Sequence, residues 1–229
     1  MLEDLKQSVC RANCDLAGSG LITLTWGNVS GIDRREGLVV IKPSGVPYAD
    51  LRPENMVVVD LDGRTVEGNL RPSSDTPTHV MLYRAFEKVG GIVHTHSRYA
   101  TIFAQARREV PCLGTTHADH FYGPVPVTRP LSESEVNEDY EGWTGRVIVE
   151  RFTGLDPIAM PAVLVAGHAP FTWGKSVGGA LDNAIALEAV AAMVLGTWSI
   201  APGAPELEPW VLEKHYQRKH GTKAYYGQK

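Results

Sequence analysis

The stretch 90–96 of the chain reads Gly-Gly-Ile-Val-His-Thr-His and combines two glycines, three β-branched residues and two histidines. The apolar residues predict a strand from Ile92 to His96, and the two glycines end the helix expected before it. Side chains two positions apart in a strand point to the same face, so the imidazoles of His94 and His96 can reach one metal ion. Two histidines so spaced are a weak signal by themselves, because exposed or hydrogen-bonded core histidines give the same pattern.

A third histidine strengthens the interpretation as a metal site. His168 follows a second apolar run, 162–166, and lies in the turn Ala166-Gly167-His168-Ala169-Pro170. Three histidines at strand ends leave a fourth coordination position open, which is how a catalytic zinc site is built. Nitrogen ligands also accept other divalent ions such as manganese. His117 and His120, in the polar stretch 115–120, are alternatives to His168 that local spacing does not separate.

Asp75 is a further candidate with two interpretations. It follows Ser73 and Ser74 and precedes a helix expected to begin near Thr76. A carboxylate in this position is either a metal ligand or an N-terminal helix cap, and the local sequence supports both equally. His79, one helical turn further on, is a candidate for the same site.

Three turns are candidates for binding a phosphate group. The turns Trp26-Gly27-Asn28-Val29-Ser30 and Lys42-Pro43-Ser44-Gly45 place small residues with free amides after expected strands, and Ser73-Ser74 precedes the helix near Thr76. Together their amides, hydroxyls and single ammonium group can surround a phosphate. Taken separately, each is typical of an ordinary turn.

Outward from these motifs, the sequence predicts a single domain over 1–229. The chain is long enough for one large core, and no segment reads as a linker. Helices and strands mix without a strict βαβ rhythm, which favours a mixed or antiparallel sheet covered by helices. Strands are expected at 21–25, 38–42, 56–60, 92–96, 125–128, 146–152 and 162–166, and helices at 2–18, from Thr76, and at 98–107, 176–198 and 208–220.

The composition predicts a globular cytoplasmic protein. Hydrophobic residues are 43% and charged residues 21% of the chain, unlike disordered sequences. A formal net charge of −4 argues against a general affinity for nucleic acid or anionic membranes. The acidic N-terminal residues do not resemble a secretory signal, and Asp182, Asn183 and Glu188 interrupt the alanine-rich helix 176–198, which we therefore expect to be too polar to span a membrane.

The cysteines predict no disulfide framework. Cys10, Cys14 and Cys112 are odd in number, and the first two lie one helical turn apart. We expect all three to be reduced thiols in the core.

Six segments, taken in order, resemble the class II aldolase and adducin-head superfamily and, within it, the L-ribulose-5-phosphate 4-epimerases. The resemblance extends over nearly the whole chain, and the segments that carry it are TWGNVSGID (25–33), VVIKPSGV (39–46), RPSSDTPTH (71–79), GGIVHTHSRYA (90–100), GTTHADHFYGPVPVTR (114–129) and KHYQRKHGTKAYYGQ (214–228). The resemblance implies a three-layer α/β/α fold with a mixed, largely antiparallel central sheet. It also implies a homotetramer with fourfold symmetry and active sites between neighbouring subunits, where the tail from about residue 208 to 229 completes a neighbour's site.

The resemblance assigns roles to residues of this chain. It implies metal ligation by His94, His96 and His168, with Asp75 on or beside the ion, and proton transfer by Asp119 and Tyr226, the latter arriving from the adjacent subunit. The phosphorylated substrate would be held by Gly27, Asn28, Lys42, Ser44, Gly45, Ser73 and Ser74, with Thr115, Glu141 and His215 in support. His120 stands where many relatives have a tyrosine, and its place beside Asp119 is expected to alter the pKa or the packing of that residue.

The implied reaction explains why these groups are needed. The proton on carbon 4 of a 2-ketose is not acidic, so inversion there requires the C3–C4 bond to break and re-form. A divalent ion, zinc or manganese, would stabilise the negative charge left by cleavage, and one acid/base group on each side of the aldehyde fragment would permit inversion. The substrate would be a phosphorylated pentulose, and both arabinose and ascorbate catabolism use this reaction.

Other members of the superfamily are the alternatives. An aldolase of the L-fuculose-phosphate type shares the metal and phosphate sites but usually has glutamate in place of Asp75, and a methylthioribulose-phosphate dehydratase differs in the tail. A non-catalytic binding module like the adducin head would have lost its ligands, whereas here the histidines and both proton-transfer candidates are present.

Overall fold

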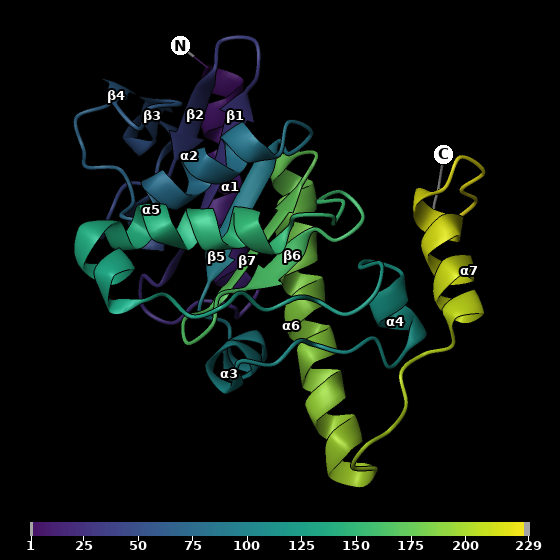
Figure 1. Cartoon of the computed structure of the whole chain (residues 1–229). Helices are drawn as coiled ribbons and strands as arrows, with labels where there is room; N and C mark the ends of the chain where they lie inside the picture. Colours follow the sequence, from purple (N-terminus) through teal and green to yellow (C-terminus); the bar gives the residue numbers. More distant parts are fainter. Residues whose placement is uncertain (1, 227–229) are drawn as a thin grey trace.

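A seven-stranded antiparallel sheet organises the molecule, and the computed structural model describes residues 2–226 (Figure 1). The strand order is β4-β3-β2-β1-β5-β7-β6, and each neighbouring pair is antiparallel. The strands are β1 (Gly27–Asp33), β2 (Leu38–Ile41), β3 (Val57–Asp60), β4 (Thr65–Glu67), β5 (Gly91–Thr95), β6 (Ala162–Leu164) and β7 (Pro170–Gly174).

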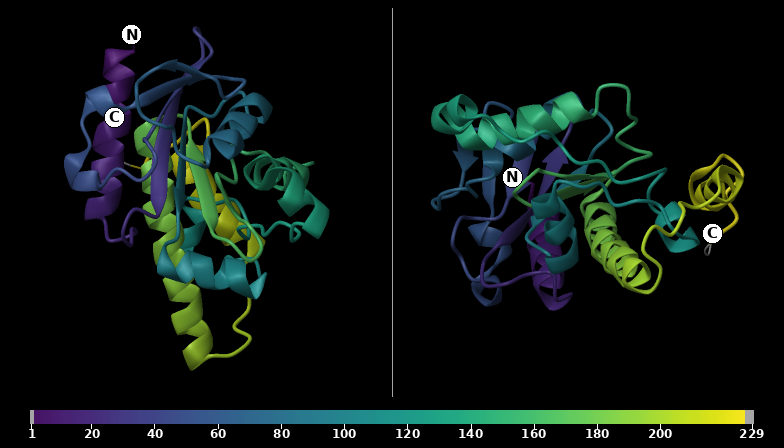
Figure 2. Two further views of the ribbon diagram at one scale, coloured as in Figure 1. Left: turned by 90° about the vertical axis from the view of Figure 1, so that its left-hand side faces the viewer. Right: turned by 60° about the horizontal axis from the view of Figure 1, so that its bottom comes forward.

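Helices cover both faces of the sheet, which confirms the expected α/β/α layers (Figure 2). One face carries α1 and the first half of α6, and the other carries α2 and α5, which pack on each other. The helices are α1 (Glu3–Gly18), α2 (Thr76–Ala85), α3 (Arg98–Ala106), α4 (Thr115–Ala118), α5 (Glu133–Arg151), α6 (Val177–Ile200) and α7 (Pro209–His220), with short 3₁₀ turns at Tyr48–Asp50 and Pro53–Asn55.

The central strands feed two apolar clusters because their side chains alternate between the faces. Val39 and Ile41 of β2 pack with α2, whereas Val40, between them, packs with α1 and α6. In β5, Ile92 belongs to the same cluster as Val39 and Ile41, and Val93 belongs to the same cluster as Val40. Burial on both faces explains why these strands are continuous runs of β-branched residues rather than alternating polar and apolar ones.

Four expectations about the elements were wrong or incomplete. Residues 146–152 are not a strand: residues 146–151 belong to α5 and Phe152 is its C-cap, and the helix begins at a capping box in which Ser132 and Glu135 bond each other's amides. Residues 21–25 form no strand, and Leu24 adopts a left-handed conformation with φ 55°. Residues 125–128 make only isolated bridges, and strand β7 was not foreseen.

Helix α6 lies unusually close to the sheet. A Cβ atom at Gly91 would lie 2.5 Å from Cα of Val177, and one at Gly174 would lie 2.7 Å from the amide nitrogen of Ala180. Glycine is required at both strand positions for this approach. By length and composition α6 could span a membrane, contrary to the expectation that it is too polar, but its apolar residues pack on β5, β7 and α3.

The cysteines follow the prediction in part. All three are free within the described residues, and Cys10 and Cys112 are buried. Cys14 is exposed, because the last turns of α1 present that side of the helix to solvent.

Helix α7 stands away from the sheet and packs against the short helix α4 (Figures 1 and 2). An extended linker, 201–208, leads to it from the end of α6. The amide of Leu207 in this linker donates a 2.7 Å hydrogen bond to the carbonyl oxygen of Cys112. We refer to residues 115–120, which include α4, together with residues 209–226, which include α7, as the α4–α7 unit.

Candidate active site

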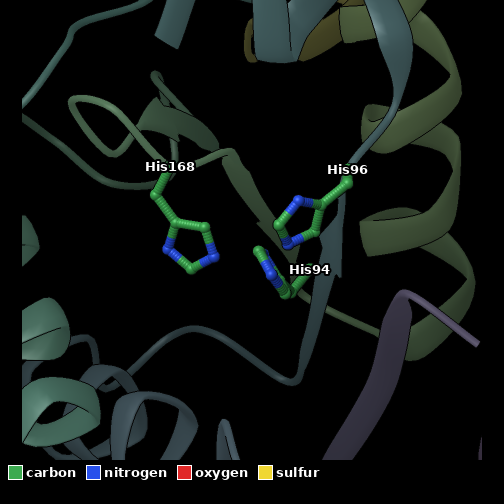
Figure 3. A group of neighbouring side chains, drawn as sticks. All are labelled: His94, His96 and His168. Carbon is green, nitrogen blue, oxygen red and sulfur yellow. The ribbon is translucent and has the colours of Figure 1, made fainter. Parts of the chain in front are cut away.

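Strand pairing brings the three predicted histidines together (Figure 3). His94 and His96 lie at the end of β5, and His168 lies in the turn between β6 and its partner β7, which also pairs with β5. One ligand atom from each imidazole lies within 4.8 Å of the others. Nε2 of His117 instead lies 2.8 Å from the carbonyl oxygen of Gly123, so His168, and not His117, is the third histidine of the cluster.

The environment keeps these imidazoles neutral. Burial and the neighbouring His96 lower the pKa of His94 to about 3, although a backbone hydrogen bond opposes the shift. Burial, His94 and His96 lower the pKa of His168 to about 3 as well. Burial also lowers the pKa of His96. A neutral imidazole has the free lone pair that a metal ion requires.

Hydrogen bonds at the second ring nitrogen orient two of the histidines. Nδ1 of His94 lies 2.9 Å from the carbonyl oxygen of Pro170 and can only donate to it, so Nε2 is left as an acceptor. Nδ1 of His168 lies 3.3 Å from the hydroxyl of Tyr140. Metal-binding histidines are commonly oriented through the other nitrogen in this way. The three residues therefore fit a divalent ion with an open coordination position.

Asp75 lies beside the three histidines rather than capping its helix. It occupies the N-cap position of α2, but its side chain makes no capping hydrogen bond. Its Oδ2 atom lies 4.0 Å from Nε2 of His94 and accepts a 2.6 Å hydrogen bond from Nδ2 of Asn28. The carboxylate thus lies next to His94, while the group of potential metal ligands within 4.8 Å of one another comprises the three histidines. His79 is not part of the cluster, because it is buried in the core with Nδ1 2.7 Å from Oγ of Ser30.

One cavity joins the histidines to the three predicted phosphate-binding turns. Its volume is about 570 Å³, and its lining consists of Thr25, Trp26, Gly27, Asn28, Lys42, Pro43, Ser44, Gly45, Ser73, Ser74, Asp75, His94, His96, Tyr140, Glu141 and His168. The turns are held together by backbone hydrogen bonds from Ser44 to Arg71 and from Ser73 to Lys42. Serine side chains and a lysine thus line the same cavity as the three histidines.

Lys42 is the cation of this cavity. Its side chain is almost completely buried, and Nζ lies 4.8 Å from the ring centroid of Tyr48. No carboxylate among residues 2–226 pairs with it, and burial lowers its pKa. A buried cation without a protein counter-ion is costly, and a phosphate in the cavity would neutralise it.

A break in α5 delivers Tyr140 and Glu141 to the cavity. Asp139 has non-helical φ −165° and ψ 84° inside this helix. The hydroxyl of Thr78 donates a 2.6 Å hydrogen bond to the carbonyl oxygen of Glu141, which ties the break to α2. The predicted residue Glu141 is therefore at the site, and Tyr140 joins it although its sequence position alone carried no signal.

Four of the predicted site residues lie elsewhere in the chain. Thr115, Asp119, His215 and Tyr226 belong to the α4–α7 unit and do not line the cavity of the same chain. His120 does not bond to the Asp119 carboxylate, whose hydrogen-bonding partners among the described side chains are Arg218 and His215, and burial lowers the pKa of His120. Residues 227–229 of the predicted tail lie outside the described residues.

Asp119 is held by α7. Nε and Nη2 of Arg218 donate to its Oδ1 and Oδ2 atoms at 3.0 and 2.6 Å, and Nδ1 of His215 lies 3.1 Å from Oδ1. Partial burial acts to raise the pKa of Asp119, but the hydrogen bonds from Arg218 and His215 outweigh it and hold the pKa below its ordinary value. Arg218 was not singled out from the sequence, although it lies within the tail motif 214–228.

The fold and the site define a class of proteins. The sequence matches the family described as "Class II Aldolase and Adducin N-terminal domain" over residues 7–195, so the chain belongs to this family. The solved structure of an L-fuculose 1-phosphate aldolase superposes with a TM-score of 0.80 at 24% identity, covering 94% of this chain and 95% of that one. At this identity the likeness concerns the fold.

Two curated relatives are much more similar in sequence. L-ribulose-5-phosphate 4-epimerase UlaF of Salmonella paratyphi A is 52% identical over 228 residues, which cover 100% of both chains. The protein of the same name from Salmonella typhi has the same identity and coverage.

Proposed function

We propose that this chain is a metal-dependent L-ribulose-5-phosphate 4-epimerase, an isomerase that interconverts L-ribulose 5-phosphate and D-xylulose 5-phosphate. The observation that carries the proposal is the single cavity lined both by the three histidines and by the phosphate-binding turns. The full-length similarity to epimerases supports this substrate over other phosphorylated sugars. A cytoplasmic enzyme of arabinose or ascorbate catabolism fits this activity.

The metal ligands would be His94, His96 and His168, with Asp75 on or next to the ion. We infer zinc as the ion, with manganese as an alternative, because three neutral imidazoles and an open position suit both. When bound, the ion supplies Lewis-acid stabilisation of the negative charge that develops as the C3–C4 bond of the ketose breaks.

The phosphate-binding turns would keep the cleaved fragment in the site. Lys42 provides a positive charge at the buried end of the cavity, and Ser44, Ser73 and Ser74 provide hydroxyl donors. Gly27, Asn28 and Gly45 leave room and amides for the phosphate oxygens. An anchored fragment can turn its aldehyde and rejoin through the other face without escaping.

Proton transfer would be the task of Asp119 and Tyr226. Since neither lines the cavity of its own chain, we infer that the α4–α7 unit of one subunit completes the site of the next, in a homotetramer with active sites at its interfaces. The tail 208–229 would then belong to the neighbour's site, together with Thr115 and His215 as supporting residues. Glu141 would support the substrate from the cavity side.

A coupled assay for conversion of L-ribulose 5-phosphate to D-xylulose 5-phosphate tests the proposal. We expect turnover that disappears with a chelator, returns with zinc or manganese, and falls in Asp119→Asn and Tyr226→Phe by roughly 100-fold or more. Accumulation of aldehyde and ketone fragments without epimerisation would identify an aldolase instead. Absence of stoichiometric metal together with absence of turnover would identify a binding module of the adducin-head kind.

A further inference from the structure

One arginine touches both proposed proton-transfer residues. The guanidinium of Arg218 forms the two-pronged bond to the Asp119 carboxylate described above, and its Cζ atom lies 4.9 Å from the ring centroid of Tyr226. Asp119 is nearly buried, whereas Tyr226 is 59% exposed, so the guanidinium lies between a buried acid and an exposed phenol. A guanidinium group that donates two hydrogen bonds to a carboxylate is held in a defined plane, against which an aromatic ring can stack.

The main chain of the same residue holds the end of the tail. The carbonyl oxygen of Arg218 accepts hydrogen bonds from the amides of Tyr225 and Tyr226, at 3.0 and 3.1 Å. The chain turns back at Gly221, whose carbonyl oxygen accepts from the amide of Ala224. This turn returns the tyrosines to the last turn of α7 and places the ring of Tyr226 beside the Arg218 guanidinium and the Lys219 ammonium group, whose Nζ atom lies 4.8 Å from the ring centroid.

We propose that Arg218 is a positioning residue that holds Asp119 and Tyr226 in one fixed relation, so that the α4–α7 unit presents both groups to the substrate together. This inference rests on the proposed epimerase function. Inversion at carbon 4 requires one acid/base group on each side of the aldehyde, and an error of about 1 Å in either group can lower the rate roughly 100-fold. The guanidinium of Arg218 is bound to Asp119 through two nitrogens and faces the ring of Tyr226, so its effect is exerted through the two residues it touches.

The charges around Asp119 make Arg218 the principal counter-ion. From α7, His215 bonds the carboxylate and Lys219 adds a weaker favourable interaction, while Nε2 of His220 lies 2.9 Å from the Asp119 backbone oxygen. The other titratable groups close to this part of the unit are His117 and His120 on either side of Asp119, and Lys175 and Asp182 near the start of α6. Of these groups only Arg218 bonds both carboxylate oxygens.

Kinetics of Arg218→Lys and Arg218→Gln, measured across pH on the metal-loaded enzyme, test the proposal. We expect kcat to fall about 100-fold in Arg218→Gln with KM within about threefold of the parent, because the phosphate and metal contacts are untouched. The acidic limb of the kcat profile should move to higher pH, since the carboxylate loses its main counter-ion. In Arg218→Lys the acidic limb should lie close to its parental pH, because the ammonium group keeps the positive charge. The kcat of this variant should stay low, because an ammonium group does not form the two parallel hydrogen bonds of a guanidinium group.

Two further measurements separate positioning from folding. Arg129→Gln is the matched control, because Arg129 also donates two hydrogen bonds to a carboxylate, that of Glu135 at the start of α5. This variant should leave kcat and its pH profile unchanged. The double variant Arg218→Gln/Tyr226→Phe should lose less than the product of the two single losses, because the residues act as a unit. An epimerase whose Arg218→Gln form kept parental kcat and pH profile, or whose losses multiplied independently, would overturn the positioning role while leaving the proposed function intact.

Discussion

The hydroxyl group of Tyr140 lies 3.3 Å from Nδ1 of His168, and the two rings are tilted at 45° with centroids 5.9 Å apart. The contact depends on the break at Asp139, because an uninterrupted α5 would direct residue 140 differently. It gives His168 a hydrogen-bonding partner at the nitrogen facing away from the other two histidines (Figure 3).

Tyr140→Phe should weaken metal binding about tenfold, because loss of a bond that orients a ligand typically lowers metal affinity by roughly 10- to 100-fold. Competition with a chromogenic chelator measures the affinity directly. Tyr99→Phe, which changes a partly exposed tyrosine on α3, is the control and should bind metal as the parent does. Equal affinities in the parent and Tyr140→Phe would show that the hydroxyl does not orient His168.

Lys42→Met should raise KM for the phosphorylated substrate by roughly 10- to 100-fold, the effect of a hydrogen bond to a charged group. The variant keeps an unbranched side chain at this position while removing the ammonium group, whose Nζ atom lies 4.8 Å from the ring centroid of Tyr48. Inorganic phosphate should inhibit the parent competitively and inhibit Lys42→Met much more weakly. Lys88→Met, at an exposed position after α2, should change neither constant; an unchanged phosphate inhibition in Lys42→Met would place the phosphate elsewhere.

Gly91→Ala should destabilise the fold by about 3 kcal/mol, because the added methyl group would meet the backbone of Val177 at 2.5 Å and α6 would have to move. Gly178→Ala provides the contrast within the same helix. Its Cβ would meet nothing within 4 Å, and alanine is the better helix former by about 0.5–1 kcal/mol. Urea unfolding of the chelator-treated proteins should therefore move the two midpoints in opposite directions. Similar midpoints would show that α6 tolerates displacement from the sheet.

Stability should fall in acid because buried histidines must be protonated, and His117 is a buried histidine that lies outside the proposed metal site. Burial lowers the pKa of His117 from 6.5 to about 4, although the bond to Gly123 opposes this shift. Between these values the unfolded chain binds a proton that the folded chain does not, so stability is lost as pH falls below about 6.5.

His117→Gln should make this loss less steep by up to about 1.4 kcal/mol per pH unit, the contribution of one proton. Urea unfolding of metal-free protein between pH 7 and 5 measures the slope. Parallel curves for the parent and the variant would mean that His117 is protonated in the folded protein as well.

Much of the candidate site could be predicted from local sequence. The His-x-His pair at a strand end, the turn that carries His168, and the serine and glycine turns after strands are short motifs whose geometry follows from a few adjacent residues. The prediction from local sequence was wrong at 146–152, where the apolar run 147–149 suggested a strand. Residues 147–149 are helical because they lie in the part of α5 that follows the break at Asp139, and the buried face of this helix packs on α2.

Only the tertiary structure decided which distant side chains meet. Arg218 reaches Asp119 across a sequence separation of 99 residues, and Tyr140 reaches His168 across 28. Periodicity and short motifs specify elements and their ends, because those depend on neighbouring residues. Contacts between elements depend on how α7 docks on α4 and where α5 breaks, and these follow from packing that no local pattern encodes.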